Sequence, residues 1–179
     1  FSALRELYGH VRTGHIYLVD VDIAKFFDTI PHEPLIDAVA ERIADGSVLR
    51  LIRLFLEALI QDGYRLVRPR AGTPQGGVIS PLLANIYLAR LDRTLDAEGV
   101  TYVRYADDVR LASRTPAGAR QALTRTAEVL EGLGLRLNPQ KTKLVSIAQG
   151  VDFLGYRLIR VKGHLNVYLT PAVVERCRA

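Results

Sequence analysis

Thr101-Tyr-Val-Arg-Tyr-Ala-Asp-Asp-Val-Arg-Leu111 is the stretch that decides the fold. β-Branched and aromatic residues from Tyr102 to Tyr105 precede two adjacent carboxylates, Asp107 and Asp108, and an alternating apolar run at residues 109–112 follows them. Such runs predict two strands, and Asp is common in the turn between paired strands. The stretch therefore predicts a hairpin with two acidic side chains at its tip.

This acidic pair has two interpretations at this point. Neighbouring carboxylates repel each other and lose hydration when they are partly buried. A divalent cation would relieve that cost, because hard cations prefer oxygen ligands. An ordinary turn, in which Asp serves the backbone, explains the same residues. The rest of the chain has to decide between the two.

The composition indicates one folded domain with a modest positive charge. The 179 residues suit a single core, and a hydrophobic content of 49% excludes a disordered chain. No apolar run approaches the roughly 20 residues of a membrane span, so we expect no membrane partner. The net charge is +5 and most cations are arginines, whose planar fork binds phosphate. This charge fits a nucleic-acid partner, although arginine enrichment also follows from genomic base composition. The single Cys177 excludes an intramolecular disulfide.

Taken in order, the rest of the chain predicts alternating strands and helices. Residues 16–23 alternate apolar and acidic side chains, which predicts a strand with Asp20 and Asp22 on one face. We expect helices at 33–43, 48–60, 81–95, 117–133 and from Pro171, and strands at 64–70, 135–137, 142–148 and, as a hairpin, within 151–168. The helix at 48–60 is expected in the core, with Asp62-Gly63 at its end. Residues 1–13 carry no predicted element. The order predicts an α+β fold, with helices packed on one face of an antiparallel sheet in a βαββαβ-like core.

Five stretches, which follow one another in the family's order, resemble the motifs of reverse transcriptases. Val19-Asp-Val-Asp-Ile-Ala-Lys-Phe-Phe-Asp-Thr-Ile-Pro31 resembles the first catalytic motif, and Tyr105-Ala-Asp-Asp108 resembles the active-site hairpin. Gly72-Thr-Pro-Gln-Gly-Gly-Val-Ile-Ser-Pro-Leu-Leu-Ala-Asn-Ile86 looks like the template- and nucleotide-contacting motif, in wording similar to the group II intron branch. Leu133-Gly-Leu-Arg-Leu-Asn-Pro-Gln-Lys-Thr-Lys143 and Phe153-Leu-Gly-Tyr156 look like the motifs that follow. The resemblance covers nearly the whole chain.

The resemblance implies a domain, an activity and a set of partners. Residues 1–179 are expected to form a reverse transcriptase domain, a palm with a remnant of the fingers, with the thumb and downstream domains outside this fragment. The implied activity is RNA-directed DNA polymerisation, which extends a DNA primer on an RNA template with deoxynucleoside triphosphates. The expected source is a group II intron or a related bacterial retroelement. Intron RNA is then a further expected partner. The expected location is the bacterial cytoplasm, with activity at the nucleoid.

Three alternatives remain beside this interpretation. A CRISPR-associated reverse transcriptase of the same lineage carries the same motifs. A non-catalytic RNA-binding scaffold with this fold need not keep the carboxylates, which are intact here. Another palm polymerase, such as one that copies RNA into RNA, is disfavoured by Phe27 and by the amino-acid sequence of residues 72–86.

The resemblance implies that Asp22, Asp107 and Asp108 are catalytic and bind two Mg²⁺ ions, with Mn²⁺ as a substitute. Two ions about 4 Å apart can activate a 3′ hydroxyl and stabilise the leaving pyrophosphate. The family spacing selects Asp22 over Asp20, which we expect to be a neighbouring solvated or ion-paired group. Asp28 is interpreted as a residue that caps or braces the following turn.

Phe27 aligns with the residue under the sugar of the incoming nucleotide, where it would exclude a 2′ hydroxyl. Simple strand alternation instead places Phe26 on the face of Asp22. The family spacing therefore requires the chain to leave strand geometry after Asp22, with Phe26 packed in the core. Lys25 either supports the triphosphate or is a solvated lysine.

The remaining implied contacts lie in three loops. Gln75 and Gly76 are expected to contact the nucleotide or the template, because an amide can donate and accept hydrogen bonds and glycines let the backbone come close. Lys141 is expected to neutralise phosphate charge near the metal ions. The run Leu154-Gly155-Tyr156 is expected to hold the primer end.

Overall fold

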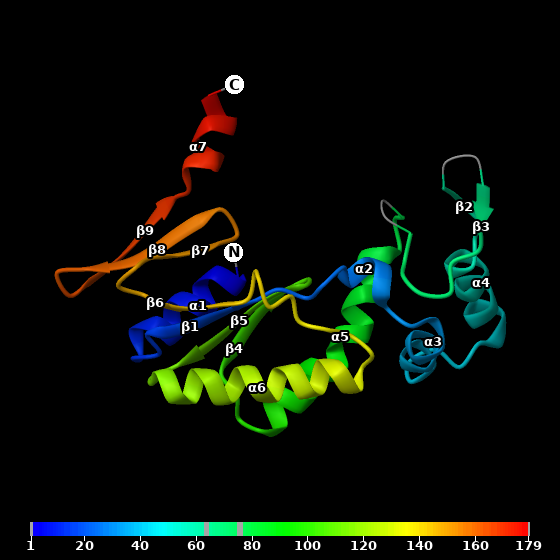
Figure 1. Ribbon diagram of the computed structural model, residues 1–179, viewed down its shortest axis with the longest axis horizontal. Coiled ribbons are helices and arrows are strands. Elements are labelled where there is room, and N and C mark those ends of the chain that lie inside the picture. Colours follow the sequence, from blue (N-terminus) through cyan, green and yellow to red (C-terminus); the bar gives the residue numbers. More distant parts are fainter. Residues whose placement is uncertain (1, 63–64, 75–76, 179) are drawn as a thin grey trace. The chain divides into compact units, whose positions relative to one another are not determined.

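The computed structural model describes residues 2–62, 65–74 and 77–178 (Figure 1). Its helices are α1 (Ser2–Arg12), α2 (Phe26–Thr29), α3 (His32–Ala40), α4 (Gly46–Leu56), α5 (Ser80–Ala97), α6 (Pro116–Gly132) and α7 (Pro171–Arg178). Its strands are β1 (Tyr17–Val21), β2 (Ile60–Asp62), β3 (Arg65–Val67), β4 (Tyr102–Tyr105), β5 (Asp108–Ser113), β6 (Lys143–Ser146), β7 (Val151–Phe153), β8 (Tyr156–Val161) and β9 (His164–Leu169).

The chain divides into two compact units. The first, here termed the sheet unit, comprises Phe1–Asp22, Leu95–Thr126 and Asn138–Ala179. The second, the helical unit, comprises Ile23–Thr94 and Ala127–Leu137. No helix in the described ranges is both long and apolar enough to cross a membrane.

Four antiparallel strands form the main sheet of the sheet unit, in the order β4-β5-β1-β6. β1 comes first in the sequence but lies inside the sheet, where Tyr17 is opposite Ser113 of β5 and Ser146 of β6. β4 and β5 form the predicted hairpin, with Tyr105 opposite Asp108. The α+β class and the βαββαβ-like order are therefore confirmed.

Both faces of this sheet carry buried apolar residues, and alternation along each strand distributes these residues between the two faces. One face carries the fully buried residues Val19, Val21, Val109 and Leu111. The other carries Leu18, Val103 and Ala112, which pack against α1 and against the strands β7 and β8. No element is predicted for residues 1–13, yet α1 buries Ala3, Leu7 and Val11. These residues recur every fourth position and so share one face of the helix.

A second antiparallel sheet of three strands, β7-β8-β9, follows in the same unit. The predicted hairpin is formed by β8 and β9, with Val161 opposite His164. Lys162 and Gly163 between them have φ of 50° and 83°. Two successive positive φ angles are typical of the tight turn that matches the twist of paired strands. α7 begins at Pro171, as predicted.

In the helical unit, α3 and α4 follow the predicted order. α3 ends at Ala40, three residues before the predicted end at residue 43. The Asp45 side chain caps α4 by accepting hydrogen bonds from the backbone nitrogens of Ser47 and Val48. This bond satisfies donors that the first turn of a helix leaves unpaired.

The prediction of a core helix over residues 48–60 is wrong. α4 ends at Leu56, and Ile60 instead starts β2 and lies opposite Val67 of β3. Ile52 and Leu56 are buried, but the side chains of Leu51 and Leu54 are 67% and 61% exposed. The run is mostly apolar, although Arg50, Arg53 and Glu57 interrupt it, and its composition alone does not show which apolar residues face the core. The predicted stop at Asp62-Gly63 falls partly on Gly63, which lies outside the described residues.

Candidate active site

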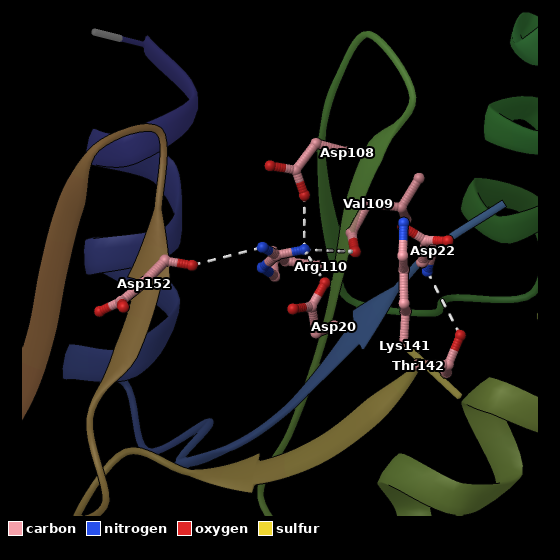
Figure 2. A network of polar contacts seen from close by, with 8 residues as sticks. All are labelled: Asp20, Asp22, Asp108, Val109, Arg110, Lys141, Thr142 and Asp152. Atoms are coloured by element: carbon pink, nitrogen blue, oxygen red, sulfur yellow. Dashed lines mark hydrogen bonds and ion pairs between the residues drawn. The ribbon is translucent and has the colours of Figure 1, made fainter. Parts of the chain in front are cut away.

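Three strand ends at one edge of the main sheet carry the predicted catalytic acids. Asp22 follows β1 directly, Asp107 lies in the β4–β5 turn, and Asp108 is the first residue of β5. Figure 2 shows Asp22 and Asp108 at this edge. Val21 is opposite Val109 in the antiparallel register. One further step in that register places Asp22 opposite Asp108. The structure therefore places stretches 86 positions apart in the numbering at the same edge of the sheet, as the family resemblance implies.

Alternation along β1 and β5 places three charged residues, Asp20, Asp108 and Arg110, on one face of the sheet. Asp20 is opposite Arg110, and Asp108 and Arg110 are two residues apart on the same strand. The neighbours Val19, Val21 and Val109 point to the other face and are fully buried. Asp20 therefore lies on the face opposite to these valines, as predicted, and this face holds the charges.

Arg110 links the acids of this face. Its Nη1 donates to a carboxylate oxygen of Asp20 and to one of Asp108, and both are ion pairs. The Arg110 side chain is 7% exposed, whereas those of Asp20 and Asp108 are 41% and 34% exposed. A guanidinium this deeply buried needs such partners, because an unpaired charge is costly to remove from water. The prediction that Asp20 is an ion-paired neighbour is confirmed.

The two acids bound to Arg110 resist ionisation. Burial raises the pKa of Asp108, the charge of Arg110 partly offsets this, and the negative charges of Asp20, Asp107 and Asp22 raise it further. Burial likewise raises the pKa of Asp20, again with Arg110 acting in the opposite direction. Burial, followed by the negative charge of the neighbouring acids, therefore opposes ionisation of Asp108.

Asp22 is held by the turn that follows α6. The backbone nitrogen of Asn138 donates to the Asp22 carbonyl at 2.8 Å. The Thr142 hydroxyl accepts from the Asp22 nitrogen at 3.3 Å, and Lys141 Nζ lies 3.8 Å from Asp22 Oδ1 (Figure 2). The exposed Lys141 therefore lies beside a candidate catalytic carboxylate, and its role toward phosphate stays a prediction.

The donor chemistry of this edge fits a divalent cation, although no ready-made cage is present. Carboxylate oxygens are the ligands that Mg²⁺ prefers, and the mutual repulsion of the acids is relieved by positive charge. Among the described residues, no group of three or more Asp, Glu, His and Cys side chains is close enough together to hold a metal ion. Asp22, Asp107 and Asp108 are the side chains that would hold it.

The Phe26-Phe27 segment lies in the helical unit and has left strand geometry, as the family spacing requires. Lys25 has a left-handed φ of 47°, and α2 follows it as a single helical turn. Phe26 is 3% exposed, Phe27 is half-buried, and their rings meet edge to face with centroids 5.2 Å apart. The core position of Phe26 is confirmed. The gating role of Phe27 stays a prediction, and so does the role of the exposed Lys25.

The loop that leads to Gln75 is bonded to the Phe27 segment. The nitrogen of Thr73 donates to the Phe27 carbonyl at 2.7 Å, and the nitrogen of Gly72 donates to the Ile30 carbonyl at 2.8 Å. Gly72 has φ of 91°, and a Cβ there would lie 2.9 Å from the carbonyl oxygens of Phe27 and Asp28. Glycine is therefore required for this close approach.

Two predicted contacts on this loop cannot be placed. Gln75 and Gly76 lie outside the described residues, so their roles toward nucleotide or template stay predictions.

The predicted primer grip forms a tight turn between β7 and β8. Leu154 and Gly155 have φ of 50° and 81°, and Phe153 is opposite Tyr156 across them. The Gly155 carbonyl accepts hydrogen bonds from the nitrogen and the hydroxyl of Thr170, which precedes α7. A Cβ at Gly155 would lie 2.8 Å from a methyl carbon of Val173. The structure explains the glycine, and the contact with a primer stays a prediction.

Comparison with known proteins identifies the family. The family model described as "Reverse transcriptase (RNA-dependent DNA polymerase)" matches residues 4–158. The chain belongs to the reverse transcriptase family. The resemblance found in the five motifs is therefore confirmed.

Relatives within this family include bacterial proteins. The chain is 34% identical over 192 aligned residues to Protein YkfC of Escherichia coli. This alignment covers 86% of this chain and 50% of YkfC. The chain is 42% identical over 80 residues to the group II intron-encoded protein LtrA of Lactococcus lactis, which covers 45% of this chain and 13% of that protein. The chain thus spans half or less of the length of these relatives.

A solved structure shares the fold of this reverse transcriptase family member. Telomerase from Candida albicans, in complex with the TWJ fragment of telomeric RNA, matches with a TM-score of 0.72 and 16% identity. The match covers 94% of this chain and 34% of the telomerase chain. At this identity, the likeness supports the fold alone.

Arg110 and Thr142 are the contacts that sequence reasoning missed. Arg110 stands between Val109 and Leu111, where a charged residue in a strand ordinarily faces solvent. Its place on the face of Asp108 followed from alternation, but its partner Asp20 lies 90 residues away. Thr142 lies one residue after Lys141, and nothing in its local pattern marks the bond to Asp22.

Proposed function

We propose that the protein is an RNA-directed DNA polymerase of a group II intron or a related bacterial retroelement. It extends a DNA primer on an RNA template with deoxynucleoside triphosphates. The observation that carries this proposal is the meeting of Asp22, Asp107 and Asp108 at one edge of the sheet. The family match over residues 4–158 supports the same activity.

The chain's own residues have distinct tasks in this proposal. When bound at the three acids, two Mg²⁺ ions, or Mn²⁺ as a substitute, would activate the primer hydroxyl and neutralise the leaving pyrophosphate. Lys141 adds positive charge beside Asp22, where the structure has an N–O distance of 3.8 Å. The turn Leu154-Gly155-Tyr156 supports the primer end.

The helical unit selects the nucleotide in this proposal. Phe27 excludes a 2′ hydroxyl by a steric clash, which discriminates against the wrong substrate. Gln75 and Gly76 contact the nucleotide or the template, and Lys25 supports the triphosphate. Residues 1–179 supply the palm and part of the fingers of the complete enzyme. It acts on intron RNA and on DNA in the bacterial cytoplasm, including at the nucleoid.

Replacement of the turn acids tests the proposal. Asp107→Asn and Asp108→Asn in the complete protein should each abolish primer extension while the protein stays folded. Removal of one charge weakens metal binding and also relieves repulsion between neighbours, so the melting temperature should stay constant or rise. Primer extension on an RNA template and thermal melting should be measured on the same preparations.

Asp37→Asn is a matched control, since Asp37 is an exposed acid on α3. It should extend primers at the wild-type rate. Robust extension by both the Asp107 and the Asp108 variants would refute the assignment of the active site.

A further inference from the structure

Arg110 is a charged side chain with partners on three strands. Its Nη1 reaches one carboxylate oxygen of Asp20 on β1 and one of Asp108 on β5. Its Nη2 donates to the Asp152 carbonyl of β7 at 3.3 Å, and its guanidinium carbon lies 5.2 Å from the centroid of the Phe153 ring. The guanidinium is thus held between β1, β5 and β7, as Figure 2 shows for the polar partners.

This arrangement fixes the position of the guanidinium. The ring of Phe153 is 1% exposed, and a cation over an aromatic face is attracted to it. The bond to the Asp152 carbonyl sets the rotation of the planar group. Because the group cannot turn without losing these contacts, the point at which Nη1 meets Asp108 is fixed as well.

Asp20 and Asp108 share this single Nη1, but they differ in what else they do. Asp108 belongs to the acidic edge with Asp22 and Asp107, whereas Asp20 lies two residues before Asp22 within β1. If Asp108 turned toward a cation, Asp20 would still pair with Arg110. That matters because a buried ion pair that loses one partner leaves a charge uncompensated.

We propose that Arg110 is a positioning residue that holds the Asp108 carboxylate, with Asp20 as its permanent counter-ion. Arg110 fixes the orientation of Asp108 before a divalent cation binds, and Asp20 keeps the guanidinium paired once Asp108 is engaged. This role rests on the proposed function, because it assumes that Asp108 is a metal ligand. It assigns a task to two residues outside the three acids.

Two substitutions separate the charge of Arg110 from its geometry. Arg110→Lys keeps the charge, but one ammonium group cannot reproduce the planar fork that meets Asp20, Asp108 and the Asp152 carbonyl. Arg110→Gln keeps a hydrogen-bond donor but removes the charge. Mn²⁺ binding, followed by the loss of the free-ion electron paramagnetic resonance signal, and thermal melting are measured on this chain. The rate of primer extension is measured in the complete protein.

The positioning role predicts that substitutions of Arg110 lower the rate of primer extension without lowering the affinity for Mn²⁺. Arg110→Lys should bind Mn²⁺ as the wild type does but extend primers about 10- to 100-fold more slowly, the cost of a small misplacement. Arg110→Gln should bind Mn²⁺ more tightly, by roughly tenfold, because a repelling charge is gone. It should nevertheless also extend primers slowly. A merely structural role would lower Mn²⁺ affinity and rate together.

Asp20→Asn tests the counter-ion. With Asp20 neutral, Arg110 interacts with Asp108 alone, so Mn²⁺ should bind more weakly than in the wild type. In the Arg110→Gln background, the same change should have a much smaller effect. Glu98→Gln is the matched control, because Glu98 pairs with the remote Arg125. It should leave Mn²⁺ binding unchanged.

Each failure has a different meaning. Wild-type extension by Asp108→Asn would overturn the active-site assignment, and with it this inference. Loss of extension in Asp108→Asn together with wild-type extension in Arg110→Lys would overturn the positioning role alone. Equal effects of Asp20→Asn with and without Arg110 would show that Asp20 acts directly on the cation and would overturn its role as counter-ion.

Discussion

Arg110 in the sheet unit and Leu51 in the helical unit depart from ordinary burial preferences in opposite directions. The Arg110 side chain is 7% exposed, although it carries a charge. Leu51 is 67% exposed and Leu54 is 61% exposed, although both are apolar. The two leucines border a groove of about 630 Å³ that residues of α3, α4 and α5 line within the helical unit.

The two departures differ in how they are compensated. Arg110 has two carboxylates, a carbonyl oxygen and an aromatic ring around it, all within the sheet unit. An exposed leucine forgoes only the roughly 1.5–3 kcal/mol that its burial would supply, whereas an unpaired buried charge costs more. A misplaced charge therefore needs partners inside the fold, whereas a misplaced apolar side chain does not.

The largest expected effect is the removal of the buried charge. Arg110→Leu should destabilise the fold by about 3–5 kcal/mol, because Asp20 and Asp108 lose their shared partner. Arg125→Leu is the control, since the 43% exposed Arg125 pairs with Glu98 and should cost less than about 1 kcal/mol. Urea denaturation measures both, and equal losses would contradict the special status of the buried pair.

A second contrast lies within the helical unit, between two adjacent rings. Phe26→Ala should cost about 3–4 kcal/mol, because it leaves a cavity in the core. Phe27→Ala should cost less, and it should raise the use of ribonucleotides relative to deoxynucleotides in the complete protein. The measurements are urea denaturation and the ratio of kcat/KM for matched substrates. An unchanged ratio in Phe27→Ala, or a greater loss of discrimination against ribonucleotides in Phe26→Ala, would show that Phe27 is not the residue that excludes them.

Charges on the exposed face of α4 should have a small effect. Leu51→Lys and Leu54→Lys should each change the free energy of unfolding by no more than about 0.5 kcal/mol, since both sites face solvent and lysine suits a helix. Both variants should also be more soluble, by light scattering. Ile52→Lys, at a site that is 7% exposed on the same helix, should be strongly destabilising. A large loss in the Leu51 variant would mean that this face is covered in solution.

The smallest effect concerns an exposed acid of the helical unit. Hydrogen bonds from Arg93 and then Arg90 hold the pKa of Glu41 below its ordinary value of 4.5. An acid with a lowered pKa stabilises the fold above its ordinary pKa, and this stabilisation disappears as the pH falls through the lowered value. Glu41→Gln should therefore melt at a slightly lower temperature than the wild type at pH 7. The difference should shrink as the pH falls below that ordinary pKa, and a constant difference would contradict the pairing.

What the sequence could predict was local. The hairpin at Asp107 and Asp108 follows from alternation and turn chemistry within eleven residues, and the structure confirms it. The cap at Asp45 is equally local. The convergence of Asp22 with the hairpin required the family resemblance, because no local pattern specifies that β1 lies between β5 and β6.

What the sequence could not predict depended on distant partners. α4 was expected in the core because the run at 48–60 is mostly apolar, although Arg50, Arg53 and Glu57 interrupt it. Arg110 was passed over because its partner Asp20 lies 90 residues earlier. α1 is different, because Ala3, Leu7 and Val11 recur every fourth position, a local helical signal that the interpretation of residues 1–13 did not use.

The position of β1 inside the main sheet has a kinetic consequence during synthesis. β1 is made before β5, and Asp20 meets its partner on β5 only after 90 further residues. At roughly 5–20 residues per second, the ribosome needs on the order of 5–20 s to make that partner. During this time both edges of β1 are unpaired, and unpaired strand edges can join other chains. Slower translation after β1 should therefore lower the yield of native protein, and chaperones that shield nascent strands should restore it.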